Sequence, residues 1–255
     1  MVRPPMGSSG LRSSKRPAPA SDDLRTLCID IGGTGIKMLV LDALGRPVNE
    51  RSRELTPSPA RRIAVLGVIK KMIPSQPPFD RVSVGFPGVV TRGVVKNAPN
   101  LGTKLWRGFD LQRALEKLVR RPVRVINDAD LQGYGVVQNK GVELVLTLGT
   151  GLGSALFIDG RLVPNLELGH HPFKKGKTYE DCVMDRVLKR IGKKAWSQRV
   201  LEMLEPLEAC FNYDVVHIGG GNAKKLRAEL PKNARVFDNV DGMRGGIRLW
   251  EKANS

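Results

Sequence analysis

Hydrophobic residues along the chain follow two spacings, one typical of strands and one typical of helices. Apolar runs at 26–31 and 36–41 flank a glycine-rich turn, which predicts two strands joined by a tight connection. Further strands are predicted at 47–54 and 81–86. At 59–72 the apolar positions recur at helical spacing, which predicts an amphipathic helix. Its apolar face is expected to contain Ile63, Leu66, Val68, Ile69 and Met72.

The same two spacings continue to the end of the chain. Short apolar runs predict a hairpin over 89–97 and strands at 123–126, 214–218 and 235–237. Helical spacing predicts helices at 109–119 (with Asp110 as N-cap), 129–138, 200–211 and 223–230, and either a last helix or an irregular segment at 242–253. Glycines at 133 and 135 favour close packing of the helix at 129–138. Because strands and helices alternate, we expect an α/β protein.

The segment 143–163 repeats the organisation of 26–42, with an apolar strand, a glycine-rich turn and a second apolar strand. Such a duplication predicts two similar lobes with a cleft between them, and chance similarity of two apolar hairpins is the alternative. A third glycine-rich turn, 219–221, follows the strand at 214–218. Three such turns after strands favour a cleft that binds a nucleotide or a polyphosphate.

The first turn carries groups that suit a polyphosphate chain. Its three glycines allow backbone N–H groups to converge on an anion, because no Cβ atom blocks the approach. A hydroxyl, an ammonium group and a carboxylate able to hold Mg²⁺ surround them. The residues concerned are Asp30, Gly32, Gly33, Thr34, Gly35 and Lys37. A plain hairpin turn is the alternative. A Rossmann site is excluded because the turn leads into a strand, and no Walker A motif occurs.

Composition and charge narrow the range of partners. The chain has 42 Lys and Arg against 25 Asp and Glu, a formal net charge of +17, and such a field attracts polyanions, among which nucleic acid, a phosphorylated substrate and inorganic polyphosphate all fit. A merely solvated basic surface is the alternative. No apolar run approaches about 18 residues, so no membrane partner is expected. Residues 1–24 predict a disordered basic tail without a signal peptide. Three separated cysteines favour buried thiols and a reducing, cytoplasmic location.

Five motifs, in this order, resemble those of the ROK sugar kinases in the actin-like ATPase superfamily. They are DIGGTGIK at 30–37, NDAD at 127–130, GTGLGSALFIDG at 149–160, ELGH at 167–170 and IGGG at 218–221. More narrowly, GSALFIDGRLVPNLELGHHPFKKGKTYEDCV and the following LKRIGKKAW resemble the polyphosphate glucokinases. The resemblance implies a two-lobed, actin-like (ribonuclease H-like) α/β fold with duplicated mixed sheets and a central cleft. The lobes would span 25–126 and 127–255, with the last helix returning to the first lobe.

Asp128 is the candidate catalytic base, because a sugar hydroxyl that attacks a phosphoryl group needs its proton accepted. The resemblance implies the same role, and a helix N-cap pair with Asn127 is the structural alternative. The implied sugar-binding residues are Gly88, Asn100, Asn127, Asp128, Glu167 and His170. The implied donor-binding residues, beyond the first turn, are Gly149, Thr150, Gly151, Gly219, Gly220 and Gly221. Asp130 is expected beside the site or at the surface, and His171 and His217 are expected to be structural.

The chain departs from many ROK proteins in its metal chemistry. Those proteins carry a C-x-C-G-x-x-G-C zinc motif after the E-x-G-H histidine, whereas 171–186 contains only Cys182, so no zinc site is expected. The basic stretch 174–199 has a helical apolar seam and is interpreted either as a solvated helix face or as a track for polyphosphate. Only two aromatic residues, Tyr179 and Trp196, lie in it, so nucleic-acid binding is not expected.

The sequence therefore predicts a glucokinase, a phosphotransferase that uses Mg²⁺ and transfers a phosphoryl group from inorganic polyphosphate, with ATP open as a second donor, to the 6-hydroxyl of glucose. The alternatives are an ATP-dependent ROK hexose kinase of other sugar specificity and a non-catalytic sugar- or polyphosphate-binding protein. A sugar-responsive transcription factor is disfavoured because residues 1–25 are too few for a helix-turn-helix domain. The resemblance implies a homodimer.

Overall fold

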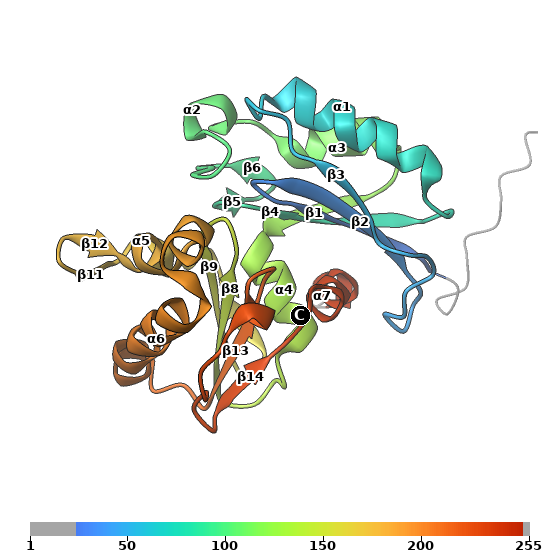
Figure 1. The fold of residues 1–255 in the computed structure, drawn as a ribbon. Coiled ribbons are helices and arrows are strands. Elements are labelled where there is room, and N and C mark those ends of the chain that lie inside the picture. Colours follow the sequence, from blue (N-terminus) through green and yellow to red (C-terminus); the bar gives the residue numbers. More distant parts are fainter. Residues whose placement is uncertain (1–23, 252–255) are drawn as a thin grey trace, which may run out of the picture.

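The computed structural model describes residues 24–251, which form two five-stranded sheets with a pair of helices between them (Figure 1). Except for Leu24, the tail predicted at 1–24 lies outside the described residues. The first sheet has the order β3-β2-β1-β4-β7. Its strands are β1 (Thr26–Ile31), β2 (Gly35–Leu41), β3 (Ser52–Leu55), β4 (Arg81–Phe86) and β7 (Val123–Asn127). Strands β1, β2 and β3 are antiparallel, and β4 and β7 add in parallel to β1.

One face of the first sheet is covered by helices, as Figure 1 shows. They are α1 (Arg62–Met72), continued by the 3₁₀ turn η2 (Ile73–Ser75), the short α2 (Thr103–Trp106) and α3 (Leu111–Val119). Asp110 caps α3 as predicted, because its side chain accepts a hydrogen bond from Arg113 N at 2.9 Å. A small hairpin, β5 (Val90–Thr91) and β6 (Val94–Val95), lies between β4 and α2 in sequence.

Two details of the first lobe were predicted wrongly. Ile63 is 86% exposed, whereas Val65, absent from the predicted face, is fully buried. The buried stripe of α1 runs through Val65, Ile69 and Met72, which leaves Ile63 on the solvent side. Strand β3 begins at Ser52 rather than at 47, because Pro47 forms only an isolated bridge with Leu41.

The second sheet repeats the topology of the first. Its order is β10-β9-β8-β13-β14, again with three antiparallel strands followed by two added in parallel. The strands are β8 (Val142–Leu148), β9 (Leu152–Ile158), β10 (Arg161–Val163), β13 (Val215–Gly219) and β14 (Ala234–Val236). Because β1–β2 and β8–β9 occupy equivalent places in the two sheets, the predicted duplication is confirmed.

The segment from 168 to 211 covers one side of the second sheet (Figure 1). It comprises η3 (Leu168–His170), β11 (Pro172–Lys174), β12 (Lys177–Thr178), α5 (Tyr179–Val183) and the long α6 (Asp185–Phe211), which is interrupted at Gly192 by a φ of 77°. The helix predicted at 223–230 is wrong beyond its first turn, η4 (Ala223–Lys225). Leu226 is extended, and Arg227 N donates to Ser197 Oγ at 2.8 Å instead of continuing a helix.

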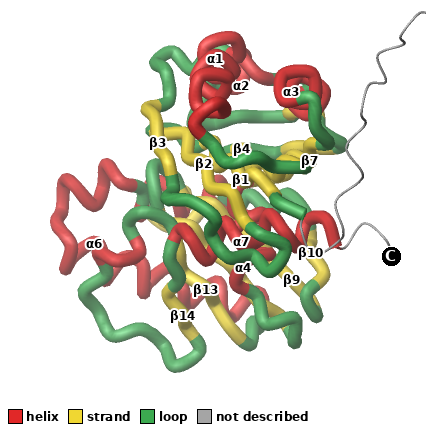
Figure 2. Tube along the Cα trace, turned by 90° about the vertical axis from the view of Figure 1, so that its right-hand side faces the viewer, coloured by secondary structure: helices red, strands yellow, loops and turns green. Residues whose placement is uncertain are grey.

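Two helices fill the space between the sheets, α4 (Asp128–Val136) and the C-terminal α7 (Asn239–Glu251), and Figure 2 shows them side by side. The predicted close packing is confirmed, because a Cβ atom on Gly135 would collide with the backbone of α7 at Asp241. Helix α7 also packs on β1 and β4, and the guanidinium carbons of Arg81 and Arg124 lie 5.2 Å and 4.3 Å from the centroid of its Trp250 ring. None of the helices within 24–251 is long and apolar enough to cross a membrane.

Candidate active site

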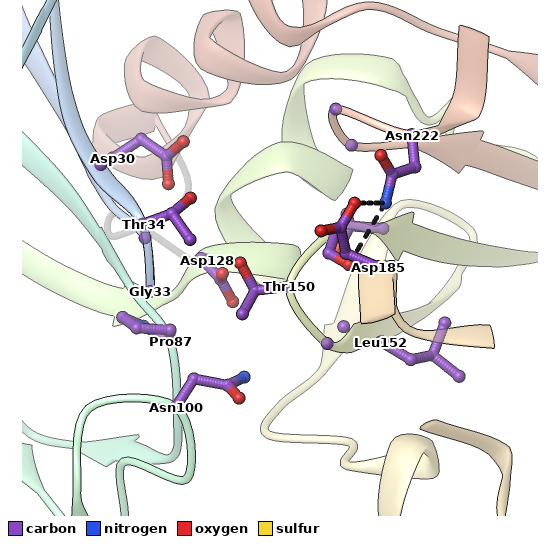
Figure 3. Close-up of a pocket in the computed structure, with 18 of the residues that line it drawn as sticks. Asp30, Gly33, Thr34, Pro87, Asn100, Asp128, Thr150, Leu152, Asp185 and Asn222 are labelled. Atoms are coloured by element: carbon purple, nitrogen blue, oxygen red, sulfur yellow. Dashed lines mark hydrogen bonds between the residues drawn. The ribbon is translucent and has the colours of Figure 1, made fainter. Parts of the chain in front are cut away.

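A cavity of about 520 Å³ lies where the two sheets approach each other, and Figure 3 shows side chains from both lobes around it. It brings together the carboxyl ends of β1, β4, β7 and β8, which places residues far apart in sequence around one volume. From the predicted sugar-binding set it is lined by Gly88, Asn100, Asn127, Asp128, Glu167 and His170. From the predicted donor-binding set it is lined by Asp30, Gly32, Gly33, Thr34, Gly35, Lys37, Gly149, Thr150, Gly151, Gly220 and Gly221.

Gly219 is the predicted site residue that does not line this cavity. It is the last residue of β13 and is buried, and a Cβ atom there would collide with the ring of Phe237. Its small size therefore serves packing between β13 and the segment after β14. The glycines that follow it, Gly220 and Gly221, reach the cavity.

The two duplicated turns face each other across the cavity. A Cβ atom on Gly33 would lie 3.4 Å from the side chains of both Thr150 and Asn100, so the first turn approaches the second closely (Figure 3). Each turn is closed by a similar backbone hydrogen bond, Gly32 N to Gly35 O at 2.9 Å and Gly149 N to Gly151 O at 3.0 Å. Both turns line the same cavity with glycines, so an anion in it could approach their backbone without meeting Cβ atoms.

Helix α4 begins at the cavity, and Asn127 holds its first turn. The Asn127 side-chain oxygen accepts from Ala129 N at 2.8 Å and Asp130 N at 3.1 Å, which is a helix N-cap. Its Nδ2 donates to Gly88 O at 3.2 Å and to Glu167 Oε1 at 3.3 Å. Asn127 thus fixes the base of the cavity and joins β7 to the loop that carries Glu167.

The Asp128 carboxyl group lies in the cavity beside this cap (Figure 3). Burial raises its pKa well above the ordinary value, and the negative charges of Asp30, Glu167 and Asp130 raise it further. A hydrogen bond accepted from Ala129 N opposes these effects. A carboxyl group with a raised pKa in a cleft is suited to accept a proton from a substrate near neutral pH.

Glu167 and His170 lie together at the mouth of the cavity. His170 Nε2 is 3.4 Å from Glu167 Oε2, with the histidine side chain about half exposed. Burial raises the pKa of Glu167, Glu180 raises it further, and His170 lowers it. The other histidines are structural, as predicted: His217 is buried against Glu143 at 2.8 Å, and the ring of His171 stacks on Tyr179.

Sequence reasoning missed several residues of the cavity. Asp185 at the start of α6 accepts a hydrogen bond from Asn222 Nδ2 at 3.2 Å, and its own N–H donates to Gly149 O at 2.9 Å. The hydrogen bond from Lys189 lowers the pKa of Asp185. The other missed lining residues are Arg51, Arg53, Pro87, Pro99, Gln132, Thr147, Leu152 and Glu180. Two further lining residues were noticed in the sequence for other reasons, Gly153 in the repeated glycine-rich segment and Lys189 in the basic stretch considered as a polyphosphate track. For Asn222 a signal existed, since it directly follows the third glycine-rich turn; Asp185 and Glu180 were hidden in the basic stretch.

The predicted donor-binding residues can hold Mg²⁺ only together with phosphate oxygens of the substrate. Within 24–251 no group of three or more His, Cys, Asp or Glu side chains is arranged to hold a metal ion. Asp30 offers one carboxylate, whose Oδ2 already pairs with Lys37 at 2.7 Å. Mg²⁺ is commonly bound by one or two carboxylates together with substrate phosphates, and Asp30 fits that pattern.

Comparison with known proteins places this arrangement in a family. A profile described as the ROK family matches residues 26–183. The chain belongs to the ROK family. Among ROK relatives, the polyphosphate glucokinase of Mycobacterium tuberculosis (strain ATCC 25618 / H37Rv) is 33% identical over 236 residues, covering 89% of this chain and 88% of the relative.

Solved ROK structures resemble this one over almost the whole chain. The inorganic polyphosphate/ATP-glucomannokinase from Arthrobacter sp. strain KM has a TM-score of 0.81 and 31% identity, covering 90% of this chain and all of the other. A ROK family glucokinase from Streptomyces griseus, in complex with glucose and AMPPNP, has a TM-score of 0.72 and 21% identity, covering 88% of this chain and 98% of the other. The predicted two-lobed actin-like α/β fold is therefore confirmed.

Proposed function

We propose that this ROK protein is a glucokinase that transfers the terminal phosphoryl group of inorganic polyphosphate to the 6-hydroxyl of glucose. The observation that carries the proposal is the position of Asp128, a carboxyl group between the sugar-binding set and two facing glycine-rich turns. The polyphosphate glucokinase of M. tuberculosis and the polyphosphate/ATP-glucomannokinase of Arthrobacter support the reaction class and the donor.

Asp128 acts as the base in this proposal. The attacking sugar hydroxyl loses its proton as the new phosphorus–oxygen bond forms, and a carboxylate in hydrogen-bonding reach accepts it. The raised pKa of Asp128 makes its carboxylate a stronger base, which favours transfer of the hydroxyl proton to it. The remaining catalysis would come from holding donor and acceptor in line, because phosphoryl transfer relies mainly on positioning and charge stabilisation.

The sugar would be held by Glu167, His170 and Asn100, with Asn127 orienting Glu167 from below. A carboxylate accepts from sugar hydroxyls, whereas an amide and an imidazole both donate and accept, so together they can distinguish hydroxyl positions. Gly88 also lines the cavity, and its small size makes room for Asn97, because a Cβ atom there would lie 2.8 Å from Asn97 Oδ1.

The donor phosphates would lie between the two turns, near Thr34, Thr150 and Lys37, with Gly220 and Gly221 at the far wall. Asp30 would hold a Mg²⁺ ion that arrives with the donor, and this ion would neutralise charge that develops on the phosphoryl oxygens. Closure of the two lobes would exclude water, which competes with glucose as the acceptor.

We also propose the division into lobes at 25–126 and 127–255, with α7 returning to the first lobe, and a homodimeric, cytoplasmic enzyme that feeds glycolysis. The separate cores of the two sheets support the division, as does the packing of α7 on β1 and β4. The three cysteines within 24–251 are free thiols, which supports a reducing compartment; Cys28 and Cys182 are buried as expected, whereas Cys210 is exposed, so the expectation of a buried thiol is wrong there.

A donor assay tests the function. The purified full chain is incubated with glucose, Mg²⁺ and either inorganic polyphosphate or ATP, and glucose 6-phosphate is measured over time. Formation with polyphosphate supports the proposal, and formation with ATP alone would instead favour an ATP-dependent ROK kinase. Glucose binding by calorimetry without turnover on either donor would favour a non-catalytic binding protein. Mannose in place of glucose measures the selectivity of the acceptor site.

A further inference from the structure

A row of cationic side chains leads from the cavity onto the surface, along the start of α6 and the loop after β13. We call it the basic strip, and it consists of Lys189, Lys193, Lys224, Lys225 and Arg227. The function proposed above uses only the cavity and leaves this strip without a role.

The inner end of the strip belongs to the cavity wall. Lys189 lines the cavity and its Nζ is 2.6 Å from Asp185 Oδ2. Lys225 Nζ approaches the same carboxylate at 4.0 Å and donates to Asn222 Oδ1 at 2.7 Å. Figure 3 shows Asp185 and Asn222 joined at this rim, where α6 meets the loop after β13. A chain leaving the cavity here therefore passes between two cations.

The outer end of the strip is held together by Ser197. Its hydroxyl donates to Lys193 O at 2.7 Å and accepts from Arg227 N at 2.8 Å. This bridge keeps α6 beside the loop beyond the cavity rim. The side chains of Lys193, Lys224 and Arg227 are exposed. Exposed cations thus stand on both of the segments that Ser197 joins.

The strip carries more positive charge than its protein neighbours balance. Within residues 24–251, Asp185 is the one carboxylate that forms an ion pair with members of the strip. Neither Lys193 nor Lys224 has an ion-pair partner in that part of the chain, and the Arg227 guanidinium donates only to the carbonyl groups of Lys224 and Leu226. Uncompensated cations in a row attract a polyanion.

The cavity itself is better suited to phosphates than to a nucleobase. Among the described residues that line it there is no Phe, Tyr or Trp, its one imidazole is that of His170 in the predicted sugar-binding set, and Pro87, Pro99 and Leu152 are its apolar members. Beside the strip the wall consists of Gly220, Gly221 and Asn222, which offer backbone and amide groups. A base would find no ring to stack on there, whereas phosphate oxygens would find donors.

We infer that the basic strip binds the distal phosphates of a long polyphosphate donor whose terminal phosphoryl group lies in the cavity. The inference rests on the function proposed above and adds where the rest of the donor runs. Each exposed cation contributes little alone and is screened by salt, but several along one chain add up. Affinity for the donor should therefore rise with its length and fall with ionic strength.

The test compares two double variants with equal charge changes. K193Q/K224Q removes two unpaired cations of the strip, and K70Q/K71Q removes two exposed cations from α1, on the outer face of the first lobe (Figure 1). For the strip variant we expect the KM for long-chain polyphosphate to rise about three- to tenfold. Its kcat should stay unchanged. The KM for tripolyphosphate should also stay unchanged, or its inhibition constant if tripolyphosphate acts only as an inhibitor. The α1 variant should match the wild type throughout.

Three outcomes overturn the inference, and they can be told apart. Equal KM values for long chains in the two double variants would show that the strip does not bind the donor, but would not contradict the proposed function. An equal loss for tripolyphosphate and long chains would show a general charge effect rather than a path for distal phosphates. A wild-type chain that phosphorylates glucose from ATP but not from polyphosphate would end both proposals. K193R/K224R, which keeps the charge, should restore the wild-type KM, and thermal melting checks that every variant is folded.

Discussion

Lys37 Nζ lies 2.7 Å from Asp30 Oδ2, directly across the first hairpin, where the two residues are register partners in β2 and β1. Both line the cavity. The Asp30 carboxylate is, after burial, the largest influence that raises the pKa of Asp128. Lys37 therefore offsets part of the negative potential that Asp128 experiences, and the first turn is coupled to the base as well as to the donor.

Replacing Lys37 by glutamine should move the acidic limb of the activity profile to higher pH. The change removes the cation that balances Asp30, so the pKa of Asp128 should rise further. Because a base works in its deprotonated form, activity would be lost at a higher pH than in the wild type. The measurement is kcat/KM for glucose across about pH 5 to 9. Lys37→Arg keeps the charge and should retain the wild-type limb; an unmoved limb in Lys37→Gln would contradict the coupling.

Asp128→Asn should abolish most of the phosphoryl transfer while leaving glucose binding intact. The amide keeps the size of the side chain but cannot accept the hydroxyl proton, so kcat should fall by about 10²- to 10⁴-fold. Calorimetry of glucose binding separates a lost base from a damaged site. Glu54→Gln, an exposed substitution on β3, is the matched control and should behave as wild type. Near-normal turnover in Asp128→Asn would remove Asp128 from the mechanism.

Much of the fold could be predicted from local patterns, because each strand and turn is specified by nearby residues. The glycine-rich turns at 32–35 and 149–151 are examples, since both the apolar flanks and the missing Cβ atoms are visible in the sequence. The helix predicted at 223–230 failed because a distant hydroxyl, that of Ser197, takes the N–H of Arg227. The prediction for α1 failed at Ile63 because hydrophobic periodicity indicates that a segment is helical but does not determine exactly which side of the helix is buried.

The cavity was harder to predict than the fold, since its walls come from segments that meet only in three dimensions. Asp185 reaches it through its N–H bond to Gly149 O and its side-chain bond with Asn222, two contacts across 36 and 37 residues of sequence. In the sequence it stands among basic residues and resembles one end of a solvated helix. For Asn127 the sequence suggested two roles, a helix N-cap and a site residue, and the structure shows that it caps α4 and also lines the cavity.

The glycines of the α4–α7 contact should be more sensitive to substitution than an exposed helical glycine. Gly135→Ala would force a methyl group against the α7 backbone, to 2.9 Å from Gly245 N, and should destabilise the fold by about 1–3 kcal/mol. A methyl group on Gly67 in α1 would meet nothing within 4 Å beyond its own helix, so Gly67→Ala should stabilise by about 0.5–1 kcal/mol. Urea unfolding measures both; equal effects would contradict the close packing.

Asp130 should make the fold less stable as pH rises. Burial raises its pKa from 3.8 to about 7, and its Oδ1 has no hydrogen-bond partner within 24–251. Between these two pKa values the folded state holds a proton that the unfolded chain releases. The contribution of this protonation to the free energy of unfolding is full below about pH 4, falls by about 1.4 kcal/mol per pH unit, and is lost by about pH 7. The side chain in Asp130→Asn cannot titrate. Between about pH 4 and pH 7 the free energy of unfolding of this variant, relative to the wild type, should therefore rise by about 1.4 kcal/mol per pH unit. Denaturant unfolding at a series of pH values measures this difference. A difference that stays constant with pH would mean that Asp130 is ionised in the folded protein.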